Sequence, residues 1–522
     1  MSTSTRMRFA LLAAVVLGGV TGCADFDREE TEFCQRNPGR CGADPGPSPD
    51  AGTEDAGSPV VLMRYDRHYT STGIVSRPAA DLATAPLELF ALDGGTLVRL
   101  QGTQEEPGRV RFEVPPGTYY AKSGELYVVT SSRQIDFSTP RFGRPDTRFT
   151  DSLSLPARLL VTGASPWNTG YGTTFMSDYL RLVDPNRGEV ANLAVFGIAS
   201  GQTSLMDAEG NYFSSTNLPV SIPEPDKGDQ AWLLQRTYLD AGVTSDGGPS
   251  LYETSTHGGL VESLASDGGM FEVKATLQPV PQKNVIFEWR RGEFAALSAE
   301  SGGFSASLFN LFATPHDITL NRFGSLVTFA LQDGARSTLV RKLTYGNPFP
   351  NTWELVGWTY SSYSTPITSA DGMLSTSRQD IFVVQEHLLE LTSAPIQPRL
   401  SLPRRFLIDG VAASESRTLG VISPMVTWEP PVLGSPSAYN LRIERYPLPG
   451  KIGPMEWVAD FRLGPSERGV RIPQGVLTSA RSYQFKLTVY AEPQTPVESP
   501  GYIGSALDHA YSTTSSGILT VP

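Results

Sequence analysis

The sequence predicts an all-β protein with several β-sandwich domains in tandem after a signal peptide and a disordered tether. Two observations predict this fold class. From Val60 onward, short stretches of alternating apolar and polar residues prevail, and helical periodicity is nearly absent. Asp-Gly pairs, which favour the tight turns of β-hairpins, follow these stretches at Asp93, Asp246, Asp267, Asp333, Asp371 and Asp409.

Residues 1–22 have the pattern of a secretory signal peptide. Arg6 and Arg8 precede an apolar stretch that is shorter than the ~20 residues of a membrane-spanning helix. The following Val20-Thr21-Gly22-Cys23 resembles the lipobox of bacterial lipoproteins. The resemblance implies lipidation of Cys23 and anchoring in the cell envelope, where Ala24 favours the outer membrane over the inner membrane. A plain secretory signal with a coincidental cysteine is the alternative.

Residues 23–59 are predicted to hold the lipidated Cys23, a small disulfide loop and a flexible linker. Cys34 and Cys41 flank a Pro-Gly turn, and in an oxidising compartment this pair favours a disulfide. The alternative is a zinc site, for which two thiols without a nearby histidine are too few ligands. From Gly42 to Pro59 the chain is mainly Gly, Pro, Ser, Ala and Asp, a composition that cannot build a core.

Residues 60–149 are predicted to form the first sandwich. Alternating segments lead into the turn sequence Pro115-Pro116-Gly117. The stretch from Phe112 to Tyr119 is similar to the prealbumin-like sandwiches found as carboxypeptidase regulatory-like domains. This resemblance implies that Phe112, Val114 and Tyr119 are core residues, and that Gly117 adopts a positive φ.

Residues 396–522 carry a second set of marks. Trp428 is followed closely by paired prolines, and Tyr483 comes six residues after Leu477. These features resemble strands B and F of a fibronectin type III domain, whose size of about 100 residues suits the separation between Trp428 and Tyr483. The resemblance implies that Trp428 fills the core and that the hydroxyl of Tyr483 bonds to nearby backbone.

Residues 150–395 alternate like β-strands but resemble no family, so one large sandwich, two smaller ones or part of a propeller remain open. A segment with notable aromatic density, from Trp353 to Tyr363, lies here. Alternation places Trp358 and Tyr360 on one face of a strand, where an exposed aromatic row could stack on sugar rings. Burial in a sandwich core is the alternative. The candidate binding residues are therefore Trp353, Trp358, Tyr360 and Tyr363.

The common catalytic motifs are missing from the sequence. It contains neither Gly-x-Ser-x-Gly nor His-Glu-x-x-His, and its five histidines are scattered singly. We therefore predict no catalytic residues, no metal site and no cofactor. The oxygen-rich segments 184–189 and 207–211 lack the spacing of a calcium loop and are interpreted as hairpin turns.

Taken together, these features predict a lipid-anchored cell-envelope protein with a binding or scaffolding role. A net charge of -12 and a pI near 5.1 argue against nucleic acid as the main partner. The expected partners are the membrane, through the lipid anchor, and polysaccharide or other envelope proteins. Two alternatives stay open: a surface glycan hydrolase with its active site in residues 150–395, and a structural subunit of an envelope assembly.

Overall fold

The structure is a computed structural model that describes residues 58–71, 73–78, 82, 86–93, 96–170, 177–215, 219–243, 249–266, 268–298, 304–315, 324–331, 337–372, 374–448, 453–491, 497–498 and 509–522. All of these belong to one compact unit, residues 57–522. The predicted signal peptide, Cys23, Cys34, Cys41 and nearly all of the predicted linker lie outside the described residues.

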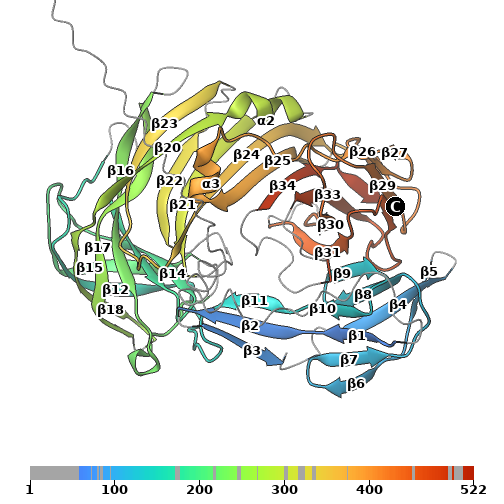
Figure 1. The fold of residues 1–522 in the computed structure, drawn as a ribbon, viewed down its shortest axis with the longest axis horizontal. Helices are drawn as coiled ribbons and strands as arrows, with labels where there is room; N and C mark the ends of the chain where they lie inside the picture. The colour runs from blue at the N-terminus through green and yellow to red at the C-terminus, as the bar shows by residue number, and fades with distance from the viewer. Residues whose placement is uncertain are drawn as a thin grey trace, which may run out of the picture. The chain divides into compact units, whose positions relative to one another are not determined.

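Strands dominate the described part of the chain, as Figure 1 shows. Its helical segments are α2 (Arg291–Leu297), α3 (Leu388–Ser393) and the 3₁₀ turn η1 (Pro225–Lys227). The all-β prediction is therefore confirmed. Among the described residues, none of the helices has the length and apolar character needed to traverse a bilayer.

The first eleven strands form two facing sheets and a small third sheet. The strands are β1 (Val60–Met63), β2 (Tyr65–Thr70), β3 (Gly73–Pro78), β4 (Leu87–Asp93), β5 (Thr96–Arg99), β6 (Thr103–Glu106), β7 (Arg109–Phe112), β8 (Tyr119–Ser123), β9 (Leu126–Thr130), β10 (Gln134–Asp136) and β11 (Thr139–Phe142). The sheet β10-β1-β7-β6 shares a hydrophobic core with strands β4, β8 and β9, while β11, β2 and β3 form the third sheet.

Phe112 and Tyr119 are buried in this core, and Val114 packs against it at its margin, as predicted. The prediction for Gly117 is wrong, because its φ is not positive. A Cβ at this position would lie 3.7 Å from the Tyr119 hydroxyl oxygen, which is ordinary contact. The hydroxyl of Tyr119 donates to the carbonyl of Pro115, so the tyrosine itself folds back over the turn.

The next strands close a sheet on itself. They are β12 (Ser154–Thr162), β13 (Tyr179–Asp184), β14 (Glu189–Val195), β15 (Leu205–Ser214), β16 (Trp232–Val243), β17 (Pro249–Ser266) and β18 (Phe271–Thr276). Their pairing runs β12-β15-β14-β13-β16-β17-β18 and returns to β12 through a parallel ladder with β18. Alternate side chains fill the interior, where Tyr212 stacks on Phe271 with ring centroids 4.1 Å apart.

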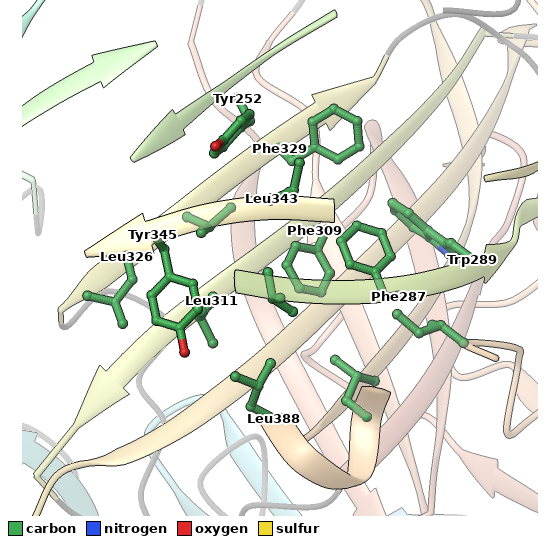
Figure 2. Close-up of a cluster of buried hydrophobic side chains, with 14 of the residues drawn as sticks. Tyr252, Phe287, Trp289, Phe309, Leu311, Leu326, Phe329, Leu343, Tyr345 and Leu388 are labelled. Carbon is green, nitrogen blue, oxygen red and sulfur yellow. The ribbon is translucent and has the colours of Figure 1, made fainter. Parts of the chain in front are cut away.

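In the remainder of the middle region, a two-stranded sheet packs on a second group of strands. The strands are β19 (Gln278–Pro279), β20 (Gln282–Arg290), β21 (Phe304–Thr314), β22 (Ser325–Leu331), β23 (Thr338–Gly346), β24 (Glu354–Thr368) and β25 (Ser375–His387). Strand β17 pairs with β22, and the sheet continues through β21, β24 and β25. Figure 2 shows the core between this sheet and the two-stranded sheet of β20 and β23, where Phe287 stacks on Phe309 with centroids 4.3 Å apart.

The C-terminal strands form two further layers. They are β26 (Arg404–Ile408), β27 (Val411–Ala412), β28 (Arg417–Thr418), β29 (Met425–Glu429), β30 (Ala438–Arg445), β31 (Glu456–Leu463), β32 (Gly469–Arg471), β33 (Arg481–Ala491), β34 (His509–Ser515) and β35 (Leu519–Val521). One layer has the order β27-β26-β29-β32, and the other runs β31-β30-β33-β34. Trp428 and Tyr483 are buried between them, and the Tyr483 hydroxyl accepts from the backbone N–H of Thr478 at 2.8 Å.

Strands of different predicted domains pair directly. Antiparallel pairing of β25 with β34 joins the middle region to the C-terminal layer, and parallel pairing of β31 with β9 joins that layer to the N-terminal strands. Both neighbouring pairs are visible in Figure 1. The regions predicted as tandem sandwiches therefore share one continuous sheet, which the alternation pattern of the sequence does not reveal.

The strands that flank five of the Asp-Gly pairs, those at Asp93, Asp246, Asp267, Asp371 and Asp409, pair antiparallel, as a hairpin requires. Asp246, Asp267 and Asp333 themselves lie outside the described residues. The pair at Asp333 lies between β22 and β23, and β23 pairs with β20 instead. This connection therefore crosses from the larger sheet to the two-stranded sheet that packs on it.

Candidate functional site

Two of the four predicted aromatic residues are core residues. Trp353 is 7% exposed, stacks on Phe349 with centroids 4.7 Å apart and meets Trp232 edge-on. Tyr363 is also 7% exposed and meets Phe382 edge-on in the same core. Their rings pack against other side chains of the protein, so the candidate binding set narrows to Trp358 and Tyr360.

Trp358 and Tyr360 lie together on the opposite face of β24. Their rings stack with centroids 5.6 Å apart and planes 22° apart, and both side chains are partly exposed. The intervening Thr359 is buried and donates its hydroxyl to the carbonyl of Val384, on the core side. The two-residue period of a strand thus produces the pair, as the alternation predicted.

The pairing register continues this face across two more strands. Trp358 lies opposite Gln385 and Tyr360 opposite Val383 in the β24–β25 ladder. Because residues directly opposite each other share a face, the β25–β34 ladder adds His509 and Tyr511. Tyr490 of β33 follows, opposite Tyr511, with ring centroids 5.6 Å apart. We call the set Trp358, Tyr360, His509, Tyr511 and Tyr490 the aromatic face; Trp358, Tyr360 and Tyr511 are partly exposed, whereas His509 and Tyr490 are buried beside them.

The partly exposed rings of the aromatic face are those of Trp358, Tyr360 and Tyr511. His509 is almost fully buried, its ring stacks on Tyr511, and its Nδ1 lies 3.2 Å from the Nε2 of Gln385. Burial, reinforced by Tyr360, raises the pKa of Tyr511 to about 12, so its hydroxyl stays neutral at physiological pH. The indole N–H of Trp358 is shielded from solvent and has no acceptor among the described residues. Such a surface suits an uncharged ring with hydroxyl groups.

The buried carboxylates of the middle region are held by protein groups. Arg187 donates from Nε to Asp184 at 2.8 Å, with both side chains fully buried, and Glu189 accepts from the hydroxyl of Ser221. Glu253 accepts from Nε of Arg236 at 2.6 Å. Burial acts to raise the pKa of Glu253, but the positive charges of Arg236 and Arg181 outweigh it and lower that pKa. Arg187, Asp184 and Glu189 therefore stabilise the closed sheet, and Arg236 and Glu253 stabilise its junction with β22.

The two oxygen-rich segments have different structures. Residues 184–189 connect β13 to β14 as a hairpin turn, as predicted, and the guanidinium of Arg187 lies against Asp184. Residues 207–211 lie within β15, so the predicted turn is wrong there. Asp207 has a φ of 58° and pairs with Arg158 across a β-bulge. In the described residues, no group of three or more His, Cys, Asp or Glu side chains is placed to hold a metal ion.

Sequence reasoning missed His509, Tyr511 and Tyr490. Their place beside Tyr360 depends on the pairing of β25 with β34, whose paired positions Val383 and Tyr511 lie far apart in the sequence. An alternating aromatic pattern in 509–511 was the available signal, but it does not identify the partner strand. No model of a known protein family matches the chain, and no curated protein matches it either.

Proposed function

We propose that this chain is a lipid-anchored cell-envelope protein that binds polysaccharide through its aromatic face. The observation that carries the proposal is the stacked, partly exposed pair Trp358 and Tyr360 on the face of β24 opposite the core. Aromatic rings bind sugars by covering the apolar face of the pyranose ring, and the partly exposed rings of Trp358 and Tyr360 offer such a surface.

The anchor is proposed from the sequence. The resemblance of residues 20–23 to a lipobox places the lipid on Cys23, and the outer membrane is the favoured location. Three acyl chains, as mature bacterial lipoproteins carry, hold a protein stably, whereas a single chain binds only marginally. The Gly- and Pro-rich residues 42–59 then act as the tether, and the loop closed by Cys34 and Cys41 lies between the lipid and this tether.

The domain families are part of the same proposal. The two layers around Trp428 and the bond from Thr478 to the Tyr483 hydroxyl support a fibronectin type III-like domain in residues 396–522. The two sheets around Phe112 and Tyr119 support a prealbumin-like sandwich in residues 60–149. Such modules commonly present a binding surface, and we assign that surface here to the sheet that the modules share.

Retention on immobilised polysaccharides tests the binding function. The full chain, Trp358→Ala, Tyr360→Ala and the control Phe196→Ala are applied to a panel of neutral and charged glycans. Phe196 is 55% exposed and directly follows β14, outside the aromatic face. We expect each aromatic-face variant to bind at least about tenfold more weakly, and the control to bind like the parent protein.

Thermal unfolding of each variant separates lost binding from lost folding, and Trp358→Phe, which keeps an aromatic ring, should retain most of the affinity. If no glycan retains the parent chain above a tag-only control, or if Phe196→Ala weakens binding as much as Trp358→Ala, the binding function is wrong.

Membrane fractionation of Cys23→Ala tests the anchor separately. We expect the variant to appear in the soluble fraction with unchanged unfolding temperature, since Cys23 lies outside the folded unit of residues 57–522. A variant that stays with the membrane after detergent-free washing would contradict lipidation at Cys23. This result would not affect the proposal that the aromatic face binds glycans.

A further inference from the structure

A pocket lies on the face of the shared sheet opposite the aromatic face. It has a volume of about 590 Å³ and is formed where the end of α2, the start of β25, the end of β34 and residues 401–407 meet. Arg378 and Asp380 of β25 belong to the core side of that strand, whereas Val383 and Gln385 belong to the aromatic face. The pocket and the aromatic face are therefore separate sites.

Three arginines line the pocket. They are Arg378 of β25 and the adjacent Arg404 and Arg405 of β26, and the fold brings these two strands together from different sheets. Glu429 faces two of them, with its carboxylate oxygens 3.4 Å from Nη2 of Arg404 and 3.0 Å from Nη1 of Arg405. One carboxylate is shared between these two guanidinium groups, so this rim of the pocket keeps an excess of positive charge.

The backbone at the rim is unusual. Arg405 has a φ of 45°, which is a left-handed conformation that is energetically unfavourable for any residue with a Cβ atom. The β26–β29 ladder is also irregular between Arg404 and Leu407. A regular strand would place consecutive side chains on opposite faces. The irregularity instead lets Arg404 and Arg405 both reach Glu429 and both line the pocket.

Hydroxyl groups and apolar surface complete the lining. Ser298 and Thr514 donate to the buried carboxylate of Asp380, at 3.0 and 2.8 Å. This pairing fixes one wall and leaves hydroxyl oxygens as acceptors. Leu297 and Phe406 add apolar surface. The volume falls within the range of about 300–1,000 Å³ that is typical of small-molecule sites.

From this lining we propose that the pocket binds an acidic saccharide, with its carboxylate or phosphate held by Arg404 and Arg405. Guanidinium groups bind both oxyanions through paired N–H donors, because their planar fork matches the spacing of the oxygens. The hydroxyls meet those of the sugar, and the apolar side chains cover its carbon atoms. Carboxylate and phosphate would both bind through the same paired N–H donors, and the experiment below distinguishes between the two groups.

Titration calorimetry of the full chain tests the proposal with three probes: digalacturonate for the carboxylate, glucose 6-phosphate for the phosphate and digalactose as the neutral control. We expect at least one acidic probe to bind at least about tenfold more tightly than digalactose and to weaken as salt is raised. Binding of digalacturonate alone identifies a carboxylate ligand, and binding of glucose 6-phosphate alone identifies a phosphate ligand.

Matched variants locate the site. The double variant Arg404→Gln/Arg405→Asn removes both charges, and asparagine tolerates the left-handed backbone at 405. Ser414→Glu adds a negative charge at an exposed lining residue and removes no contact that Arg404 or Arg405 makes. Arg399→Gln is the control, since Arg399 is an exposed arginine that pairs with Glu386 and is not part of the lining.

Both pocket variants should lose acidic-probe binding by about tenfold or more, while Arg399→Gln should not. Should the double variant fail to fold, Ser414→Glu alone carries the test. The proposal is overturned if neither acidic probe binds more tightly than digalactose, or if Ser414→Glu binds the acidic probe as tightly as the parent chain does. Trp358→Ala should leave binding of the acidic probe unchanged. The test of this pocket is therefore independent of the test of the aromatic face.

Discussion

Tyr127 stacks on Phe461, with ring centroids 4.7 Å apart and planes 17° apart. The two residues lie directly opposite each other in the parallel ladder of β9 and β31. Tyr127 belongs to the region predicted as the first sandwich and Phe461 to the region predicted as the last. Because the contact is buried and shared, the N-terminal and C-terminal strands contribute to one core.

Replacing Tyr127 should therefore destabilise both regions together. Tyr127→Ala removes a ring that is 7% exposed, at an expected cost of about 3–5 kcal/mol, the usual range for a large buried aromatic. Calorimetry should show one shifted transition that includes residues of both regions. Two separate transitions, of which only one moves, would contradict the shared core.

Trp428→Ala tests the C-terminal core itself. Trp428 is 3% exposed and lies 5.3 Å, centroid to centroid, from the ring of Tyr439. We expect a loss of about 3–5 kcal/mol in the free energy of unfolding measured by denaturant titration. The control is Trp457→Ala, since Trp457 is 47% exposed. Equal losses for the two tryptophans would mean that Trp428 does not fill a core.

The sequence predicted the class of fold and the side of a strand on which a residue lies. Thr359 and Trp358 show this, because the period of two separates the core side from the outer side without knowledge of the partner strand. It did not predict which aromatic residues are exposed. Trp353 precedes β24 in a turn, where alternation gives no information, and its burial depends on Phe349 and Trp232.

Pairing between distant strands explains what else was missed. The partner of β25 is β34, and that choice is made by edge complementarity between two regions that the sequence separates by more than a hundred residues. Likewise, Arg378 and Arg405 line one pocket although they lie on different sheets. A sequence pattern cannot predict contacts between distant strands. The aromatic face and the pocket lined by Arg378 and Arg405 are therefore recognisable only in the tertiary structure.

The buried pair Arg236 and Glu253 should be strongly coupled. Arg236 is fully buried, and Arg181 approaches the same Glu253 oxygen at 3.6 Å. Arg236→Met leaves a buried carboxylate with less compensation, and Glu253→Leu leaves a buried guanidinium, so each should cost about 3–5 kcal/mol. The double variant should cost clearly less than the sum of the two. Additive losses in denaturant titration would show that the charges do not interact.

Alkaline pH should destabilise the folded unit through its buried tyrosines. Burial raises the pKa of Tyr127, Tyr179 and Tyr446 to about 12 from the ordinary value of 10.0. In the unfolded chain these phenols lose their protons near pH 10, so the unfolded state binds fewer protons than the folded state between about pH 10 and 12. The stability that the buried neutral phenols provide is therefore complete below pH 10 and is lost as the pH rises toward 12.

Denaturant titrations across this range should show a falling free energy of unfolding, with a shallower fall in Tyr446→Phe. An absorbance titration of the folded protein should show ionisation of the buried phenols near pH 12. A flat stability profile between pH 10 and 12 would mean that these hydroxyls are open to solvent.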